Sequence, residues 1–479
     1  MLIGRGERGG VLTDFAKHCL FILGAGPLTI RAYEEARRLG IYTVAIDRFE
    51  TTFNQRPGPP IGSDRRRPQG SYPALCEASD SVICDLKDQT QLKETMAFLV
   101  KRKKEQGFSK FAVMTCGADL DWSVATAAFQ IGAPGLNPAV AERCFNKRLM
   151  HNWLDRVGFS ARARLAHRSE RAHFFPVVIK PLDQCASRGV EIVNSESELQ
   201  EALFRIGPYS KSGILLEEYL EGSKHTCETI VEDGDAKMVS IIDTHYISRR
   251  YPCETGLNST TLSEENQIKL GQFAQEVADA LGVEWGPFKV DVNFDGTEFK
   301  LIECTARLSG GFHCQYASPV AYGTQEIEAV IRQACGDPLD EKLIYHRWNR
   351  GAAVRCPFTS FGRIVSYNQD RPTSVDGVDQ AIMTRAIGDP AGPYRNSADR
   401  VGFVLAHGKT TEEAIRNADL GVKHFQIETD DYTACPLCGS DDIEQVRRAI
   451  DEPIEFYCGN CLEELNYFPS RSIELYDRF

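Results

Sequence analysis

Polar side chains that could bind a metal and an anion follow an apolar strand in the stretch KLIECTARLSGG. Successive side chains of a strand point to opposite faces, so Glu303, Thr305 and Arg307 would share one face. A carboxylate, a hydroxyl and a guanidinium in a row suit a metal ion held beside an anion. Taken alone, the stretch also fits a solvated edge strand with an incidental ion pair, because short motifs often match by chance.

Three other stretches supply groups that suit a bound nucleotide. In FPVVIKPLDQCASRGVEIV, Lys180 ends a strand, and the loop after it offers backbone amides and Ser187 to phosphate oxygens. Lys147 stands at a helix start in FNKRLM, and the strand in LLEEYLEG could read an adenine edge through its backbone. Asp291 and Glu303, on neighbouring predicted strands, are the hard oxygen ligands that Mg²⁺ prefers when phosphates complete its shell.

The order and spacing of these stretches resemble the ATP-grasp family, in the branch with biotin carboxylase, carbamoyl phosphate synthetase and amino-acid ligases. The similarity covers roughly residues 18–430. KPLDQCASRGV resembles the family's flexible phosphate loop, with Ala186 where a glycine is usual, and EEYLEG resembles its hinge strand. The spacing from Asp291 to Glu303 matches the family's metal pair, whereas Thr305 stands where the family usually has asparagine.

The resemblance implies a role for each matching residue. ATP phosphates would be held by Lys147, Lys180 and Ser187, and adenine by Glu217 with the backbone around Tyr219 and Leu220. His225 or Lys224 would lie near the ribose. Mg²⁺ would bind Asp291 and Glu303, with Thr305 beside them, and Arg307 would face the reacting carboxylate and acyl phosphate.

The helices and strands that position these residues predict an α/β and α+β multidomain chain. HCLFILGAGPLTIRAYEEARRLGIYTVAID predicts a strand, a helix and a second parallel strand, and helices are predicted at 141–157 and 264–281. In TTEEAIRNADLG, a capping threonine with glutamate three places on marks a helix start. We predict a Rossmann-like lead domain, an ATP-grasp module, a closing α/β segment and a small zinc ribbon, at residues 18–130, 131–345, 346–430 and 431–479.

The glycine turn after the first strand resembles the start of a dinucleotide fingerprint. Gly24 and Gly26 are present and Asp47 has a suitable distance for a ribose contact, but Thr29 replaces the third glycine. A Rossmann-like domain without a dinucleotide is the alternative. Residues 50–73, rich in Pro, Gly and Arg, are predicted to form a mobile surface loop.

If Asp291 and Glu303 bind one metal ion, the turn between their two strands must place both side chains on the same face. A plain two-residue turn at Asp295 and Gly296 would put Asp291 and Glu303 on opposite faces, because side chains alternate. We therefore predict a three- or five-residue loop, or a bulge, with Gly296 a candidate for positive φ.

Composition favours an ordinary soluble protein of the cytoplasm. The chain has 479 residues, enough for about three domains, with 42% apolar residues and a formal charge of −12. The acidic balance without a large basic block argues against a nucleic-acid partner. We expect no membrane association, since no apolar run reaches spanning length and the N-terminus lacks a signal peptide's apolar core.

The C-terminal tail carries two Cys-x-x-Cys pairs, CPLCG and CGNC, with 19 residues between them. This spacing is typical of a four-cysteine zinc site, and four protein ligands make such a site structural. We predict Zn²⁺ bound by Cys435, Cys438, Cys458 and Cys461. The alternative is two pairs of redox or free thiols.

Together these features predict an ATP-dependent carboxylate–amine ligase that forms an amide or peptide bond through an acyl phosphate and releases ADP and phosphate. By resemblance to amino-acid ligases, both substrates would be amino acids or small peptides. Ligases of this branch are often dimers, which leaves a homodimer open as one oligomeric state of this chain. One alternative is a bicarbonate-activating carboxylase, although no Met-Lys-Met biotinylation site is present. Another is a non-enzymatic zinc-ribbon binding protein with a vestigial grasp fold.

Overall fold

The structure is a computed structural model that describes most of residues 14–430. The residues outside its description in that range are 49–72, 156–157, 159–162, 167–171, 173, 183, 208–209, 211, 247–249, 361 and 393. In the tail it describes the strands β20 (Ile443–Val446), β21 (Glu455–Cys458) and β22 (Glu463–Asn466), which form one antiparallel sheet. Most of the predicted surface loop at 50–73 therefore lies outside the described residues.

The lead domain is a parallel four-stranded sheet in the order β3-β2-β1-β4. Its elements are β1 (His18–Leu23), α1 (Ile30–Arg38), β2 (Tyr42–Asp47), β3 (Asp80–Ile83), α2 (Gln89–Glu105), β4 (Lys110–Met114) and α3 (Asp121–Ile131). Gly24, at φ +101°, makes the turn after β1. The Asp47 carboxylate closes this turn by accepting a hydrogen bond from the Ala25 amide at 2.8 Å, which is a structural use of that carboxylate.

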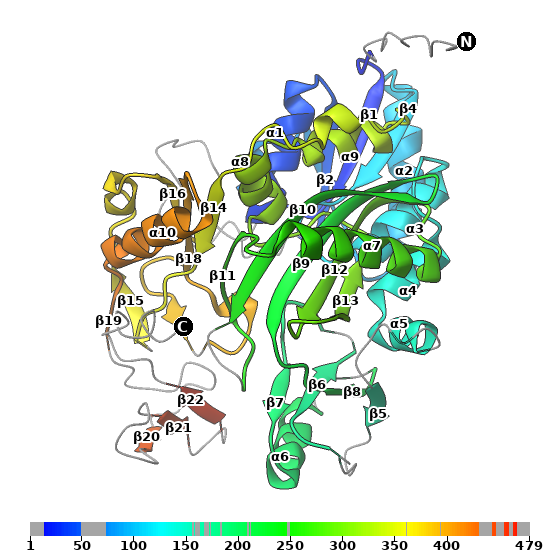
Figure 1. The fold of residues 1–479 in the computed structure, drawn as a ribbon. Coiled ribbons are helices and arrows are strands. Elements are labelled where there is room, and N and C mark those ends of the chain that lie inside the picture. Colours follow the sequence, from blue (N-terminus) through cyan, green and yellow to red (C-terminus); the bar gives the residue numbers. More distant parts are fainter. Residues whose placement is uncertain are drawn as a thin grey trace, which may run out of the picture.

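A small antiparallel sheet in the order β5-β8-β6-β7 carries the predicted phosphate loop and the predicted hinge strand. Its elements are β5 (Ala163–Ala166), β6 (Val177–Pro181), β7 (Glu191–Val193), α6 (Glu196–Ile206) and β8 (Ile214–Glu218). In Figure 1 this sheet and α6 lie below the larger sheet, so a ligand between the two sheets is approached from both sides.

The large sheet has eight strands in the order β13-β12-β9-β10-β11-β14-β18-β16. The strands are β9 (Ser223–Glu232), β10 (Asp235–Tyr246), β11 (Glu254–Ser259), β12 (Trp285–Phe294), β13 (Phe299–Thr305), β14 (Gly351–Arg355), β16 (Val378–Met383) and β18 (Gly402–Gly408). Because β14 pairs with β11, with Gly256 opposite Arg355, the sheet runs without a break from the predicted ATP-grasp module into the predicted closing segment.

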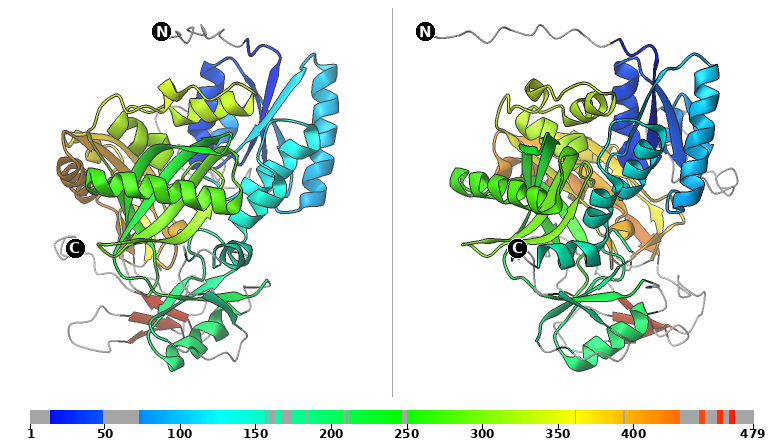
Figure 2. Two further views of the ribbon diagram at one scale, coloured as in Figure 1. Left: turned by 45° about the vertical axis from the view of Figure 1, so that its right-hand side comes forward. Right: turned by 90° about the vertical axis from the view of Figure 1, so that its right-hand side faces the viewer.

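Helices cover the large sheet. α7 (Glu264–Leu281) lies across one face of β9 and β12, as Figure 2 shows, and packs Leu270 and Ala274 against Phe288 and Val290. α10 (Thr411–Phe425) covers β14 and β18. The remaining elements are α8 (Ser318–Tyr322), α9 (Glu326–Ala334), the π-helical turn η4 (His313–Ala317), and a three-stranded sheet of β17 (Pro390–Ala391), β15 (Gly362–Ser366) and β19 (Glu428–Asp430).

Local capping explains where several helices begin. The Thr410 hydroxyl accepts from the Glu413 amide at 3.2 Å, which confirms the predicted start of α10. The predicted single helix at 141–157 is wrong: α4 (Pro138–Phe145) ends and α5 (Lys147–Leu154) begins at Asn146. The Asn146 side chain accepts from the amides of Arg148 and Leu149 at 3.1 and 3.3 Å and so caps a new helix.

Among the described residues, no helix is long and apolar enough to cross a membrane.

Candidate active site

Asp291 and Glu303 face each other directly across β12 and β13. Phe294 pairs with Phe299 around a four-residue turn, and a shift in register between Asp291 and Val292 then brings Asp291 opposite Glu303. Gly296 has φ +100°. The bulge that was predicted as one of the three solutions is therefore confirmed, and it aligns the two carboxylates on one face.

The surroundings of the two carboxylates fit a Mg²⁺ ion. The Thr226 hydroxyl donates to Asp291 at 2.6 Å, and the Lys289 ammonium pairs with the other Asp291 oxygen. In the part of the chain that the structure describes, the buried Thr305 hydroxyl has no hydrogen-bond partner. Among the described residues no group of three or more His, Cys, Asp or Glu could hold a metal. Mg²⁺ in proteins commonly takes one or two carboxylates and completes its shell with phosphate oxygens and water, which this donor set allows.

Two lysines line the same cavity. The Lys147 ammonium lies 3.5 Å from a Glu303 oxygen, and the Lys180 ammonium pairs with Glu217. The other Glu217 oxygen is 2.8 Å from Nε2 of His151. Burial opposes ionisation of Glu217, but the charge of Lys180 and the bond from His151 outweigh it and lower the pKa of Glu217 to about 2. The Glu217 carboxylate thus holds Lys180 in place.

The phosphate loop contains two residues other than glycine with left-handed backbone conformations. Ala186 has φ +56° and Ser187 has φ +59°, followed by Gly189 at φ +70°. Ala186 thus adopts the conformation that a glycine would adopt without steric cost. Its carbonyl accepts from the Ser397 amide at 3.1 Å, which ties the loop to the predicted closing segment.

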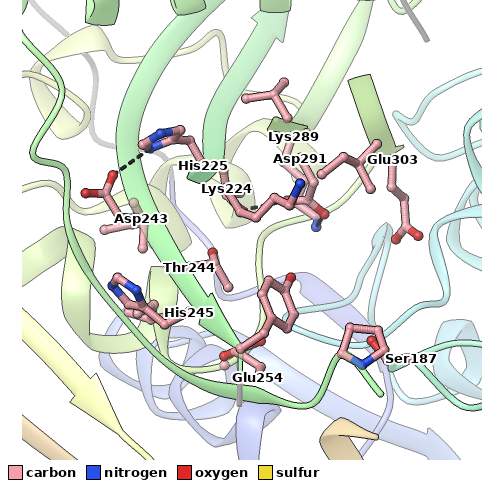
Figure 3. Close-up of a pocket in the computed structure, with 18 of the residues that line it drawn as sticks. Ser187, Lys224, His225, Asp243, Thr244, His245, Glu254, Lys289, Asp291 and Glu303 are labelled. Atoms are coloured by element: carbon pink, nitrogen blue, oxygen red, sulfur yellow. Dashed lines mark hydrogen bonds and ion pairs between the residues drawn. The ribbon is translucent and has the colours of Figure 1, made fainter. Parts of the chain in front are cut away.

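Two residues of the predicted hinge line the cavity. Tyr219 and Leu220 line the cavity just after β8, and the Lys224 ammonium donates to the Leu220 carbonyl at 2.7 Å. Burial lowers the pKa of Lys224 to about 8. Because Thr226 pairs directly with Asp291, the neighbouring His225 projects from the other face of β9. His225 also lines the cavity, but its Nδ1 is bonded to Asp243 at 2.7 Å, as the dashed line in Figure 3 shows.

Arg307 is held by a carboxylate of the lead domain. Nε of Arg307 donates to Asp119 at 3.2 Å, and a terminal guanidinium nitrogen makes a second, shorter bond to the same oxygen. Burial opposes ionisation of Asp119, but Arg307 lowers the pKa of Asp119 to about 2, and Asp119 in turn raises the pKa of Arg307. The guanidinium is therefore a fixed cation at the cavity wall.

One cavity of about 1200 Å³ collects nearly all the predicted residues. It is lined by Lys147, Lys180, Ser187, Glu217, Tyr219, Leu220, His225, Asp291, Glu303 and Arg307, whereas Thr305 is not part of its lining. Figure 3 shows Lys289, Asp291 and Glu303 together at this cavity, with Ser187 on a separate strand-connecting loop.

The sequence interpretation missed three residues of this site. Lys289 is two residues before Asp291 in the same strand, so the alternation rule that joined Glu303 to Arg307 could have found it. Asp119 follows the carboxyl end of the parallel strand β4, where ligand-binding residues of such sheets gather. Thr226 gave no signal, because only the pairing of β9 with β12 brings it to Asp291.

Comparison with known proteins agrees with this geometry. Residues 173–315 match the family model of the ATP-grasp domain, and residues 358–430 match that of the L-amino acid ligase C-terminal domain 2. Among solved structures, an L-amino acid ligase from Bacillus licheniformis superposes with a TM-score of 0.72 at 21% identity, covering 88% of this chain and all of that one. A phosphoribosylglycinamide synthetase from Anaerococcus prevotii gives a TM-score of 0.64 at 18% identity, covering 86% and 100%.

Curated relatives share about a quarter of their aligned residues with this chain. The uncharacterized protein y4rH of Sinorhizobium fredii is 24% identical over 334 residues, which are 65% of this chain and 66% of that protein, slightly under two thirds of its length. A formate-dependent phosphoribosylglycinamide formyltransferase of Methanocaldococcus jannaschii is 24% identical over 351 residues, covering 68% and 78%.

The two facing sheets and the cavity between them form an ATP-grasp fold, in agreement with the family match over residues 173–315. More narrowly, residues 173–315 are similar to an ATP-grasp domain, and residues 358–430 are similar to the C-terminal domain 2 of L-amino acid ligases.

Proposed function

We propose that the enzyme joins the carboxylate of one amino acid or small peptide to the amine of another. The observation that carries this proposal is the fixed cation of Arg307 in the same cavity as Lys147, Lys180 and the paired carboxylates. The match of residues 358–430 to an L-amino acid ligase domain supports amino acids as the substrate class.

In this mechanism, the first substrate's carboxylate binds beside Arg307. A carboxylate oxygen attacks the γ-phosphorus of ATP, the bond to the β-phosphate oxygen breaks, and an acyl phosphate and ADP form. The amine nitrogen of the second substrate then attacks the acyl carbon, and the carbon–oxygen bond to phosphate breaks, so that phosphate leaves with the bonding electrons. No covalent bond to the enzyme is required.

The protein's share of catalysis is positioning and charge neutralisation. Lys147 and Lys180 neutralise phosphate oxygens, and Lys180 exchanges its bond to Glu217 for one to the nucleotide. Asp291 and Glu303 would hold Mg²⁺, which supplies further neutralisation of the phosphates when bound. Arg307, fixed by Asp119, stabilises charge on the activated carboxylate.

The test is a screen of purified enzyme with Mg²⁺–ATP and pairs of amino acids, measuring ADP release and product mass. A pair that yields ADP and a product of the summed mass less one water supports the proposal. Parallel reactions with formate and with bicarbonate test other small carboxylates, since curated relatives include a formate-dependent enzyme. ADP release with only formate or bicarbonate would move the assignment to those substrates, and no ADP release with any substrate would refute it.

We also propose a structural Zn²⁺ bound by Cys435, Cys438, Cys458 and Cys461. These side chains lie outside the described residues. The spacing of the two pairs supports the site, and so does the strand pairing: Ile443, which begins β20, is opposite Cys458, which ends β21. The chain therefore enters β20 and leaves β21 at one end of the sheet. A homodimer and a cytoplasmic location complete the proposal, to be tested by light scattering and cell fractionation.

A further inference from the structure

His313 is held at the cavity wall by an unusual backbone. It begins the π-helical turn η4, its side chain is almost fully buried, and it lines the cavity together with Arg307 and Gly311. Phe312, just before it, has φ +67°, a conformation that bulky residues rarely adopt. Such backbone strain persists only where the surrounding structure enforces it, and both strain and π-helical turns concentrate at functional sites.

Polar and charged groups from three strands surround the His313 ring. Nε2 lies 2.8 Å from the Ser240 hydroxyl of β10 and 3.8 Å from a carboxylate oxygen of Glu228 on β9. The other Glu228 oxygen accepts from the Ser309 amide at 2.5 Å. Lys289 and Asp291 of β12 are the other charges that act on the ring. Glu228, Thr226 and Asp291 project from the same face of the large sheet, so the ring sits on the side of the metal pair.

The ring has the protonation state of a proton acceptor. Burial lowers the pKa of His313, so that the imidazole is neutral at pH 7. Burial, reinforced by the charge of Glu228, raises the pKa of Glu326 on α9 to about 8, so this neighbour is uncharged and Glu228 is the carboxylate that faces the ring. The Ser240 and Glu228 oxygens favour the tautomer with its proton on Nε2. Nδ1 then carries a lone pair, and no hydrogen bond from a described residue occupies it.

We propose that His313 is the general base that takes a proton from the second substrate's ammonium group before it attacks the acyl phosphate. This inference rests on the proposed ligase function. An ammonium nitrogen has no lone pair and cannot attack. Nδ1 of His313 accepts one N–H proton, and the resulting imidazolium is stabilised by Glu228. The free amine attacks the acyl carbon, the carbon–oxygen bond to phosphate breaks, and the second N–H proton leaves with phosphate as hydrogen phosphate.

The experiment compares two nucleophiles in the same enzyme. Hydroxylamine is uncharged at neutral pH and traps an acyl phosphate as a hydroxamate, whereas an amino acid arrives as an ammonium ion and needs a base. In His313→Gln we expect hydroxamate formation within about threefold of wild type. Coupling to an amino acid should fall by about a hundredfold or more, the usual contribution of general-base catalysis. His346→Gln is the matched control, because His346 is exposed, bonds the Val239 carbonyl and does not line the cavity.

Several outcomes separate this role from a structural one. Equal loss of both reactions in His313→Gln would show that the ring merely supports the fold, and retention of both would show that it takes no proton. If His313→Gln does not fold, His313→Ala with added imidazole replaces it. Imidazole should then restore amino-acid coupling, and failure to do so in a variant that still makes hydroxamate would overturn the proposal. A wild type that makes neither product nor ADP would instead refute the ligase function itself.

Discussion

Replacing Glu217 by glutamine should lower the local stability of the sheet β5-β8-β6-β7. The size of this loss can be calculated from the pKa of Glu217. The substitution keeps the side-chain shape but removes the charge that holds Lys180 and His151. The pKa of Glu217 falls from its ordinary 4.5 to about 2 in the folded protein. At about 1.4 kcal/mol for each tenfold change in proton affinity, this corresponds to about 3 kcal/mol of stabilisation at pH 7.

Hydrogen exchange of the amides that join β6 to β8 measures this effect where it acts. At pH 7 we expect these amides to exchange roughly a hundredfold faster in Glu217→Gln than in wild type, as about 3 kcal/mol of lost local stability requires. Because the folded pKa is depressed, the contribution is complete above pH 4.5 and is lost as pH falls toward 2. Near pH 3 the difference between the two proteins should be about half as large.

A matched control is Glu201→Gln, which removes an exposed carboxylate from α6 in the same subdomain. Its side chain is 59% exposed and its nearest cation, Arg205, is 3.9 Å away, so the exchange rates should hardly change. Saturating ATP should narrow the gap between Glu217→Gln and wild type, because phosphates then pair with Lys180. Exchange rates that do not differ at pH 7, or a difference that persists undiminished at pH 2, would contradict the electrostatic account.

The other predictions concern catalysis and metals. Glu303→Ala should abolish ADP formation while circular dichroism stays unchanged, and near-normal turnover would exclude Glu303 from the Mg²⁺ site. Arg307→Ala should lower the rate of substrate-dependent ADP release by about a hundred- to a thousandfold, the usual loss on removing one electrostatic stabiliser of a transition state. A raised Michaelis constant with an unchanged turnover rate would show that Arg307 acts in substrate binding alone. Metal analysis should find one zinc per chain, and replacing both Cys435 and Cys438 by serine should remove it; zinc retained in that variant would place the metal elsewhere.

Sequence reasoning succeeded where a local rule fixes the geometry. Alternation along β12 and β13 demanded an irregularity between Asp291 and Glu303, and the bulge supplies it. Capping chemistry placed the start of α10 at Thr410. The same kind of rule failed at Asn146, because the apolar spacing continues through the break while the asparagine side chain ends one helix and begins the next.

Contacts between distant segments could not be predicted in the same way. Asp119 and Arg307 are 188 residues apart, and only the packing of the lead domain against the large sheet brings them together. His225 illustrates a different limit: the motif places it near a nucleotide, but the register of β9 against β12 decides which face its ring occupies. Both the contact between Asp119 and Arg307 and the orientation of His225 depend on how distant segments pair and pack. A single sequence does not specify that pairing.

The unbroken hydrogen-bonding between β11 and β14 has a consequence for protein engineering. Exchanging residues 346–430 for the corresponding part of another ligase would cut a sheet through its middle, at the ladder that pairs Gly256 with Arg355. The host strand β11 and the donor's counterpart of β14 would then have to pair although their side chains are not matched to each other. Strand edges that stay unpaired promote aggregation. A chimaera with altered substrate preference should therefore keep β14, β16 and β18 with the host and graft only β15, β17 and β19, which form a separate sheet.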